Sequence, residues 1–234
     1  MFKLGIINYN STSTNTGNIL NAPMTANSHD FSGHGYNGTD STTITYSSQW
    51  GLYSNSPTSS VYNTLFPSWV TTSLNNSSFT ISLWANISSY DSWSWYGCIF
   101  VNDSSSPDAH TWMWIHSWYL RLTHYAWWSP SIDLDYLADI SVWEHFIAFS
   151  YNYSTWDYAW YVNSGTPNAG SASAWINLNQ SWQFAVSRKW TQWTAAPSSN
   201  QIAGYVRWIN VFSSVLTPTQ IGRASCRERV SSPV

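Results

Sequence analysis

The stretch FTISLWANI at residues 79–87 decides the fold class of this chain. Its residues fall into two alternating sets, Phe79, Ile81, Leu83 and Ala85 on one side and Thr80, Ser82, Trp84 and Asn86 on the other. A period of two places successive side chains on opposite faces of a β-strand. We therefore predict a strand here, with the apolar set facing a core.

Further strands are expected on both sides of this stretch, and no long helix interrupts them. The expected strands are 97–101, 111–115, 118–125, 142–152, 158–165, 182–188 and 204–212. The second and third suit a hairpin with its turn near His116–Ser117. A short helix is expected at LTPTQI, with Thr217 as N-cap and Pro218 as the first helical residue. Many short strands separated by turn residues predict an all-β sandwich or barrel.

The composition suits an exposed β-protein such as a lectin, a virion protein or a cell-surface module. Aromatic residues make up 18% of the chain and charged residues only 8%, against about a quarter in ordinary domains. Disordered chains lack such aromatic content, so disorder is excluded. The length of 234 residues allows one all-β domain with a sizeable core.

The last residues differ from the rest of the chain. The segment IGRASCRERV at residues 221–230 can be encoded by a common short-read sequencing adapter read in frame. We interpret it as translated adapter from assembled environmental DNA and leave it out of the fold reasoning. Without its three arginines and one glutamate, the eight basic and eleven acidic residues become five and ten, a net charge of −5. That charge disfavours a nucleic-acid partner. Cys98 is then the only cysteine, which excludes a disulfide scaffold.

We expect three regions: a polar N-terminal segment that is a strand or a linker (1–28), a single domain (29–221) and an artefactual tail (222–234). No apolar run approaches the 18 residues of a membrane span, so no membrane insertion is expected. The start contains only LGII as an apolar stretch, too short for a signal peptide. The expected location is extracellular or on a virion surface.

A cluster of turn residues, DFSGHGYNGT, occupies residues 30–39. Gly33, Gly35 and Gly38 allow positive φ angles. The Asp30 carboxylate can accept hydrogen bonds from the backbone amides that follow it. A calcium ion bound by Asp30 and neighbouring carbonyls is the alternative.

These stretches resemble the concanavalin A-like lectin/glucanase superfamily, in its laminin-G-like jelly-roll branch. DFSGHGYNGT (30–39) is similar to the D-x-S-G-N-G-x-x-G-T motif, and SFTISLWANI (78–87) to F-T-I-S-x-W-V. WEHFIAFSYN (143–152) with WYVNSG (160–165) is similar to W-x-H, an apolar run and Y-V-N-G, and 204–221 is similar to the closing strand and turn. The resemblance implies two antiparallel sheets packed as a jelly-roll sandwich, with Trp84, Trp143 and Trp160 in the core.

The chain departs from that family in its last motif, where Arg207 and Trp208 replace an acidic pair, and in its first, where His34 replaces Asn. If the acidic pair holds calcium or orders a loop in the family, that role is in doubt here.

Glycoside hydrolysis is disfavoured. Retaining glycosidases need two carboxyl groups about 5–5.5 Å apart. Glu144 and Glu228 are the only glutamates, and Glu228 lies in the suspected tail. Asp133 and Asp135 share a face of any strand there, but we interpret them as a solvated edge. No nucleophile elbow or zinc motif occurs. We therefore expect no enzymatic activity.

Tryptophans outside the strands are the candidate ligand-binding residues. Six lie among turn residues: Trp93, Trp95, Trp127, Trp128, Trp190 and Trp193. Exposed flat rings suit the apolar faces of sugars, while nearby polar side chains bind hydroxyls. We therefore expect a non-catalytic carbohydrate-binding module that binds a glycan or polysaccharide, on a phage tail or microbial surface. The alternative is a structural or adhesion module whose aromatics form homo-oligomer or virion contacts.

Overall fold

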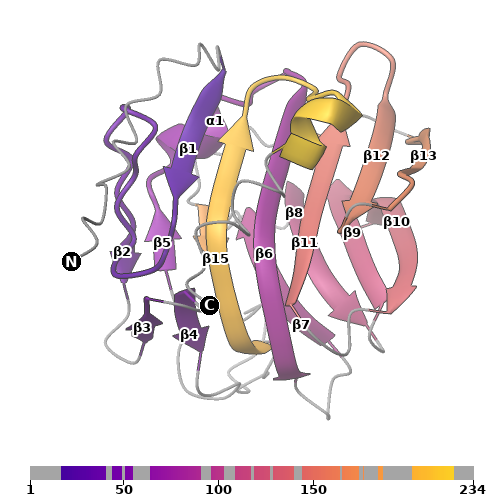
Figure 1. The fold of residues 1–234 in the computed structure, drawn as a ribbon. Coiled ribbons are helices and arrows are strands. Elements are labelled where there is room, and N and C mark those ends of the chain that lie inside the picture. Colours follow the sequence, from indigo (N-terminus) through magenta and orange to yellow (C-terminus); the bar gives the residue numbers. More distant parts are fainter. Residues whose placement is uncertain are drawn as a thin grey trace.

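The structure is a computed structural model of two packed β-sheets (Figure 1). It describes residues 17–40, 44–48, 51–54, 64–90, 96–102, 109–116, 119–126, 129–139, 144–163, 165–173, 176, 184–186 and 202–223.

The larger sheet has eight antiparallel strands. Its order is β13 (Asn168–Ser171), β12 (Asp157–Val162), β11 (Glu144–Tyr151), β6 (Phe79–Tyr90), β15 (Ile202–Phe212), β4 (Gly51–Ser54) and β3 (Thr45–Ser47), and β1 (Asn18–Ala22) also pairs with β15. The smaller sheet has the order β10 (Ser129–Asp139), β9 (Tyr119–Ala126), β8 (Ala109–His116), β7 (Tyr96–Asn102), β14 (Phe184–Val186), β5 (Thr64–Phe66) and β2 (Thr39–Asp40). The predicted all-β, two-sheet antiparallel jelly-roll sandwich is confirmed.

The main core lies between the two sheets. Strand β6 supplies Phe79, Ile81, Leu83 and Ala85, the alternating set expected from the sequence, and Ile87 continues it. They pack in one cluster with side chains of the smaller sheet and its neighbours, including Phe66, Met113, Leu122, Phe184 and Val186. Burying each large apolar side chain stabilises the folded state by about 1.5–3 kcal/mol. The apolar face of β6 therefore turns towards the core, because a shift by one residue would expose all of these side chains.

A second apolar cluster covers the outer face of the larger sheet, the face that looks away from the smaller sheet. Trp84, Phe146, Ala148 and Tyr161 pack there beneath Ile221. Trp84 is buried as expected, but in this outer cluster, because its position in β6 is the opposite one to Phe79 and Ile81. Trp160 lies in the core between the sheets, and Trp143 lies outside the described residues.

The segment that covers this outer face is the short helix expected near the C-terminus, which spans residues 218–223. Thr217 and Gln220 form a capping box: the Thr217 backbone amide donates to Gln220 Oε1 at 2.8 Å, and the Gln220 amide donates to Thr217 Oγ1 at 3.3 Å. Ile221 is buried, and Gly222 and Arg223 continue the helix. The expected boundary between domain and tail therefore falls inside a helical turn. Residues 224–234 lie outside the described part of the chain.

The N-terminal segment contributes a strand, and the folded unit begins earlier than the expected residue 29. Strand β1 pairs with β15 from Asn18–Phe212 to Ala22–Ile209. Leu20 and Met24 have no exposed surface. The sequence did not reveal this strand because two of its buried residues, Ile19 and Leu20, are adjacent and so break the alternation expected of a strand. No helix in the described ranges is long and apolar enough to cross a membrane.

Candidate functional site

Exposed apolar side chains gather at one end of the sandwich. The register pairs Tyr151 with Phe79 and Phe212 with Thr80, so β11 and β15 end where β6 begins. This is the upper end in Figure 1, where α1 (Trp69–Thr72) also lies, and we call it the α1 end. Four large apolar side chains are exposed among the described residues, and Trp69, Trp156 and Val215 of these belong to segments at the α1 end. The fourth is Phe31, in the glycine turn after β1.

The helical turn α1 exposes Trp69 because its other face is anchored. Val70 and Leu74 are buried in the main core. The Val70 amide donates to the Pro67 carbonyl, and the Ser73 amide to the Trp69 carbonyl. Trp69 itself is 64% exposed, so its indole is free to contact a ligand or another protein.

The turn between β11 and β12, residues 152–156, holds Trp156 in a fixed place. The Asn152 amide donates to the Asp157 carbonyl and the Trp156 amide to the Asn152 carbonyl, both at 2.8 Å. The Ser154 amide donates to Asn152 Oδ1 at 3.0 Å. Trp156 adopts a left-handed backbone with φ of 63° and leaves 42% of its surface exposed. Glycine or asparagine is usual in this conformation, which costs other residues about 1–2 kcal/mol.

The same turn is fastened to its neighbours at the α1 end. Tyr153 donates through its backbone amide to Ser78 Oγ at 3.0 Å and through its hydroxyl to Asn76 Oδ1 at 3.3 Å. On the other side, the Ala172 amide donates to the Trp156 carbonyl at 2.8 Å. These bonds reach both the α1–β6 connection and the end of β13, so the turn is held from two sides.

The residue after Trp156 in the chain, Asp157, carries a charged group. Asp157 is fully exposed, and Ser171 Oγ donates to its Oδ1 at 2.5 Å. Hydrogen bonds from Ser171, and then from Thr155, lower the pKa of the Asp157 carboxyl below its usual range. The β11–β12 turn thus combines a flat apolar ring, hydroxyl groups and an ionised carboxylate.

The six tryptophans singled out from the sequence lie outside the described residues: Trp93, Trp95, Trp127, Trp128, Trp190 and Trp193. Trp156 was missed, because its exposure depends on a left-handed backbone that the sequence does not reveal. The available signal was a bulky aromatic residue at the last position of a short polar turn between two strands.

Asp30 caps the glycine turn as expected. Its Oδ1 accepts from the backbone amides of Ser32 at 2.8 Å and Asn21 at 3.1 Å, and its Oδ2 accepts from the Tyr36 amide at 3.0 Å and the Ser32 hydroxyl at 2.8 Å. One carboxylate therefore ties β1 to both ends of the turn.

The calcium alternative does not fit this arrangement. Both Asp30 oxygens face hydrogen-bond donors, whose positive ends would repel a cation, whereas calcium requires six to eight oxygen ligands. Among the described residues no group of three or more His, Cys, Asp or Glu side chains could hold a metal ion.

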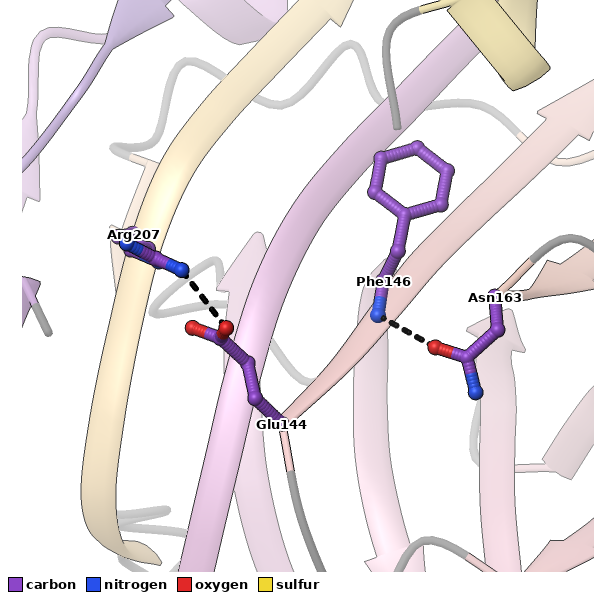
Figure 2. A network of polar contacts seen from close by, with 4 residues as sticks. All are labelled: Glu144, Phe146, Asn163 and Arg207. Atoms are coloured by element: carbon purple, nitrogen blue, oxygen red, sulfur yellow. Dashed lines mark hydrogen bonds and ion pairs between the residues drawn. The ribbon is translucent and has the colours of Figure 1, made fainter. Parts of the chain in front are cut away.

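Glu144 is held by an arginine. Arg207 donates from Nη2 to Glu144 Oε2 at 2.7 Å (Figure 2). In the same network the Phe146 amide donates to Asn163 Oδ1 at 3.2 Å. Asp133 and Asp135 lie on β10, at the edge of the other sheet. Arg207 thus neutralises the carboxylate of Glu144.

No protein-family model and no curated protein sequence matches this chain. Among solved structures, it is similar to domain 4 of AbnA, a GH43 extracellular arabinanase from Geobacillus stearothermophilus, in complex with arabinotriose. The identity is 15%, the TM-score is 0.64, and the match covers 89% of this chain and 98% of that one. It is also similar to botulinum neurotoxin type C, which depends upon interaction with two ganglioside molecules to enter cells, with 17% identity and a TM-score of 0.67.

A third similar structure is the binding domain of botulinum neurotoxin DC in complex with rat synaptotagmin II, with 17% identity and a TM-score of 0.66. Each botulinum match covers 92% of this chain and 52% of the other, so the chain spans about half the length of those proteins. At these identities the likeness establishes the β-sandwich fold.

Proposed function

We propose that this chain is a non-catalytic, lectin-like carbohydrate-binding module of a phage virion, phage tail or microbial surface protein, and that it binds glycan at the α1 end. The observation that carries this proposal is Trp156, an exposed indole held by a hydrogen-bonded turn beside the carboxylate of Asp157. A flat ring next to hydroxyls and a carboxylate suits a sugar, which has apolar faces and polar edges.

The backbone of Trp156 supports a functional reason for the ring. A bulky residue with a positive φ has a strained backbone, and this conformation is kept only where neighbouring contacts hold it in place. Here two backbone hydrogen bonds hold the conformation, one from the Trp156 amide to the Asn152 carbonyl and one from the Ala172 amide to the Trp156 carbonyl. Glycine would satisfy the same turn without strain, so the indole is retained for something other than stability.

The fold comparisons support a binding module as well. The arabinanase domain, which matches over nearly its whole length, was solved with arabinotriose bound. The six tryptophans of the sequence analysis, Trp93, Trp95, Trp127, Trp128, Trp190 and Trp193, stay proposed ligand-binding residues separate from the Trp156 site.

A glycan array probed with the full chain tests the proposal, using Trp156→Gly as the decisive variant. Losing one stacking ring should weaken binding roughly five- to a hundredfold, taking about 1–3 kcal/mol for a stacked ring. Relief of the left-handed strain should at the same time raise the free energy of unfolding by about 1 kcal/mol. Weaker binding with higher stability cannot come from unfolding.

Phe31→Ala is the matched control, because it removes another exposed aromatic side chain from a different turn. It should leave glycan binding unchanged. If Trp156→Gly bound glycan as tightly as the unchanged protein, the glycan-binding site would not be at the α1 end.

A structural or adhesion module is the second candidate, and the exposure of Trp69 and Val215 favours it. Aromatic side chains are enriched in protein interfaces. Light scattering of the full chain and of Trp69→Ala distinguishes the two: oligomers that dissociate in the variant would support a protein contact at α1.

A further inference from the structure

Asp157 lies on the outer face of the larger sheet, at its edge. Along β12, Tyr158 and Trp160 pack with the main core, while Ala159 and Tyr161 pack with the outer cluster. Because side chains alternate along a strand, Asp157 shares the outer face with Ala159 and Tyr161. Its pairing partner is Ser171 of β13, the last strand of the sheet. The carboxylate therefore stands on the outer face beside the edge strand β13, one residue along the chain from Trp156.

The charge of Asp157 is not neutralised by a cation. Its bonding partners are the neutral residues Ser171 and Thr155, and in the part of the chain that the structure describes no Lys, Arg or His forms an ion pair with it. Glu144 shows the contrast, since its carboxylate meets the guanidinium of Arg207 at 2.7 Å. Of these two carboxylates, Asp157 is the one that presents a net negative charge to a ligand.

From this position we infer that the site at the β11–β12 turn selects neutral, hydroxyl-rich glycans and rejects glycans carrying carboxylate or sulfate groups. The inference rests on the proposed function of the same site. An ionised carboxylate only accepts hydrogen bonds, so it pairs with sugar hydroxyls and repels anionic groups. Asp157 directly follows the exposed Trp156 at the end of the β11–β12 turn, so the carboxylate is the nearest charged group along the chain to a ligand bound at this turn.

The lowered pKa of Asp157 strengthens the argument from geometry, because the carboxyl keeps its charge when the solution becomes weakly acidic. Bonding to Ser171 also fixes one carboxylate oxygen, Oδ1.

The experiment is an array of matched pairs, in which each neutral oligosaccharide core is printed with and without a sialic acid, uronic acid or sulfate group. The unchanged chain should bind the neutral member of a pair at least about fivefold more tightly. Asp157→Asn should weaken neutral binding roughly three- to tenfold, because a charge-assisted hydrogen bond becomes a neutral one. In the same variant, the ratio of the affinity for the neutral member to the affinity for the acidic member of each pair should be close to one.

Asp40→Asn serves as the charge control. It removes the same charge from β2, the last strand of the smaller sheet, and should keep the preference intact. A preference for acidic members, or an unchanged ratio in Asp157→Asn, would overturn the inference while leaving glycan binding in place. Binding to no glycan by the unchanged chain would overturn the proposed function, and the inference with it.

Discussion

Arg207 and Glu144 form an ion pair across strand β6, joining two strands that are not paired with each other. Arg207 lies on β15 and Glu144 on β11, and both strands pair with β6. The guanidinium carbon lies 5.9 Å from the centre of the Trp84 ring, so the arginine also covers the indole of the middle strand. The pair therefore braces three neighbouring strands on the outer face (Figure 2).

Glu144→Gln should destabilise the protein by about 3 kcal/mol, as measured by urea unfolding. The Arg207 side chain is only 6% exposed, and removing its carboxylate leaves a buried charge poorly compensated. The double variant Glu144→Leu with Arg207→Leu should lose less than Glu144→Gln, because apolar replacements remove both charges. An unchanged midpoint in Glu144→Gln would mean that water already screens this pair.

Asp30→Ala should lower the free energy of unfolding by about 2 kcal/mol, the upper range for a lost side-chain cap. The carboxylate accepts four hydrogen bonds, and their donors would lose their partner together. Thermal unfolding of the unchanged protein should be insensitive to EDTA. If EDTA lowered the thermal midpoint of the unchanged protein but not that of Asp30→Ala, the result would show that this turn binds calcium.

Ile221→Ala should destabilise by about 2–4 kcal/mol, because it opens a cavity above the outer apolar cluster. A chain that stops after Arg223 should keep the thermal midpoint of the full chain. A chain that stops after Thr217 lacks both Gln220 and Ile221 and should unfold at a clearly lower temperature. Equal midpoints for the two truncations would show that the helix covering Trp84 adds nothing to stability.

Tyr46 should make the fold sensitive to alkali. Burial raises the pKa of the Tyr46 hydroxyl, and the hydrogen bond to Asp40 Oδ2 at 2.7 Å and the charge of Asp40 raise it further. In the unfolded chain tyrosine ionises near pH 10. The stability from the protonated hydroxyl is therefore complete below about pH 10, and it is lost as the pH rises from there towards the higher folded pKa.

Urea unfolding between pH 8 and 12 measures this effect, and Tyr46→Phe should show a shallower decline. The decline should not vanish, since burial also raises the pKa of Tyr151 and Tyr161. If Tyr46→Phe lost stability with pH as steeply as the unchanged chain, the Tyr46–Asp40 contact would not form in solution.

Most of the long strands were predictable because apolar alternation is local. Phe79, Ile81 and Leu83 mark one face of β6 by themselves, and β7, β8, β9, β11, β12, β14 and β15 fall at the strands expected at 97–101, 111–115, 118–125, 142–152, 158–165, 182–188 and 204–212. The long strand β10 was not expected, and most of the short strands were not predictable. β2 contains only Thr39 and Asp40, and it exists because β5 offers backbone partners from a distant part of the sequence. Such pairing is a tertiary effect that leaves no periodic pattern.

The candidate site was only partly accessible from the sequence. Asp30 could be identified as a turn cap because Ser32 and Tyr36, two of its partners, follow it closely in the same turn. Trp156 could not, since its exposure follows from a left-handed backbone and from bonds to Asn152 and Ala172. The helix cap at Thr217 and Gln220 was predictable in position, whereas the burial of Ile221 against Trp84 joins residues far apart in the chain.

The position of β15 has a consequence for how the chain folds during synthesis. β15 pairs with β6 along one side and with β1 and β4 along the other, and the backbone bond from Ser213 to Gly17 closes the same seam across nearly the whole described chain. β1, and the edge of β4 that β3 does not pair with, therefore have no partner until β15 has left the ribosome. Folding that depends on such distant pairings is slow, and the waiting strand edges invite aggregation. Recombinant production should accordingly benefit from slow translation at low temperature, which limits the concentration of nascent chains that still lack β15.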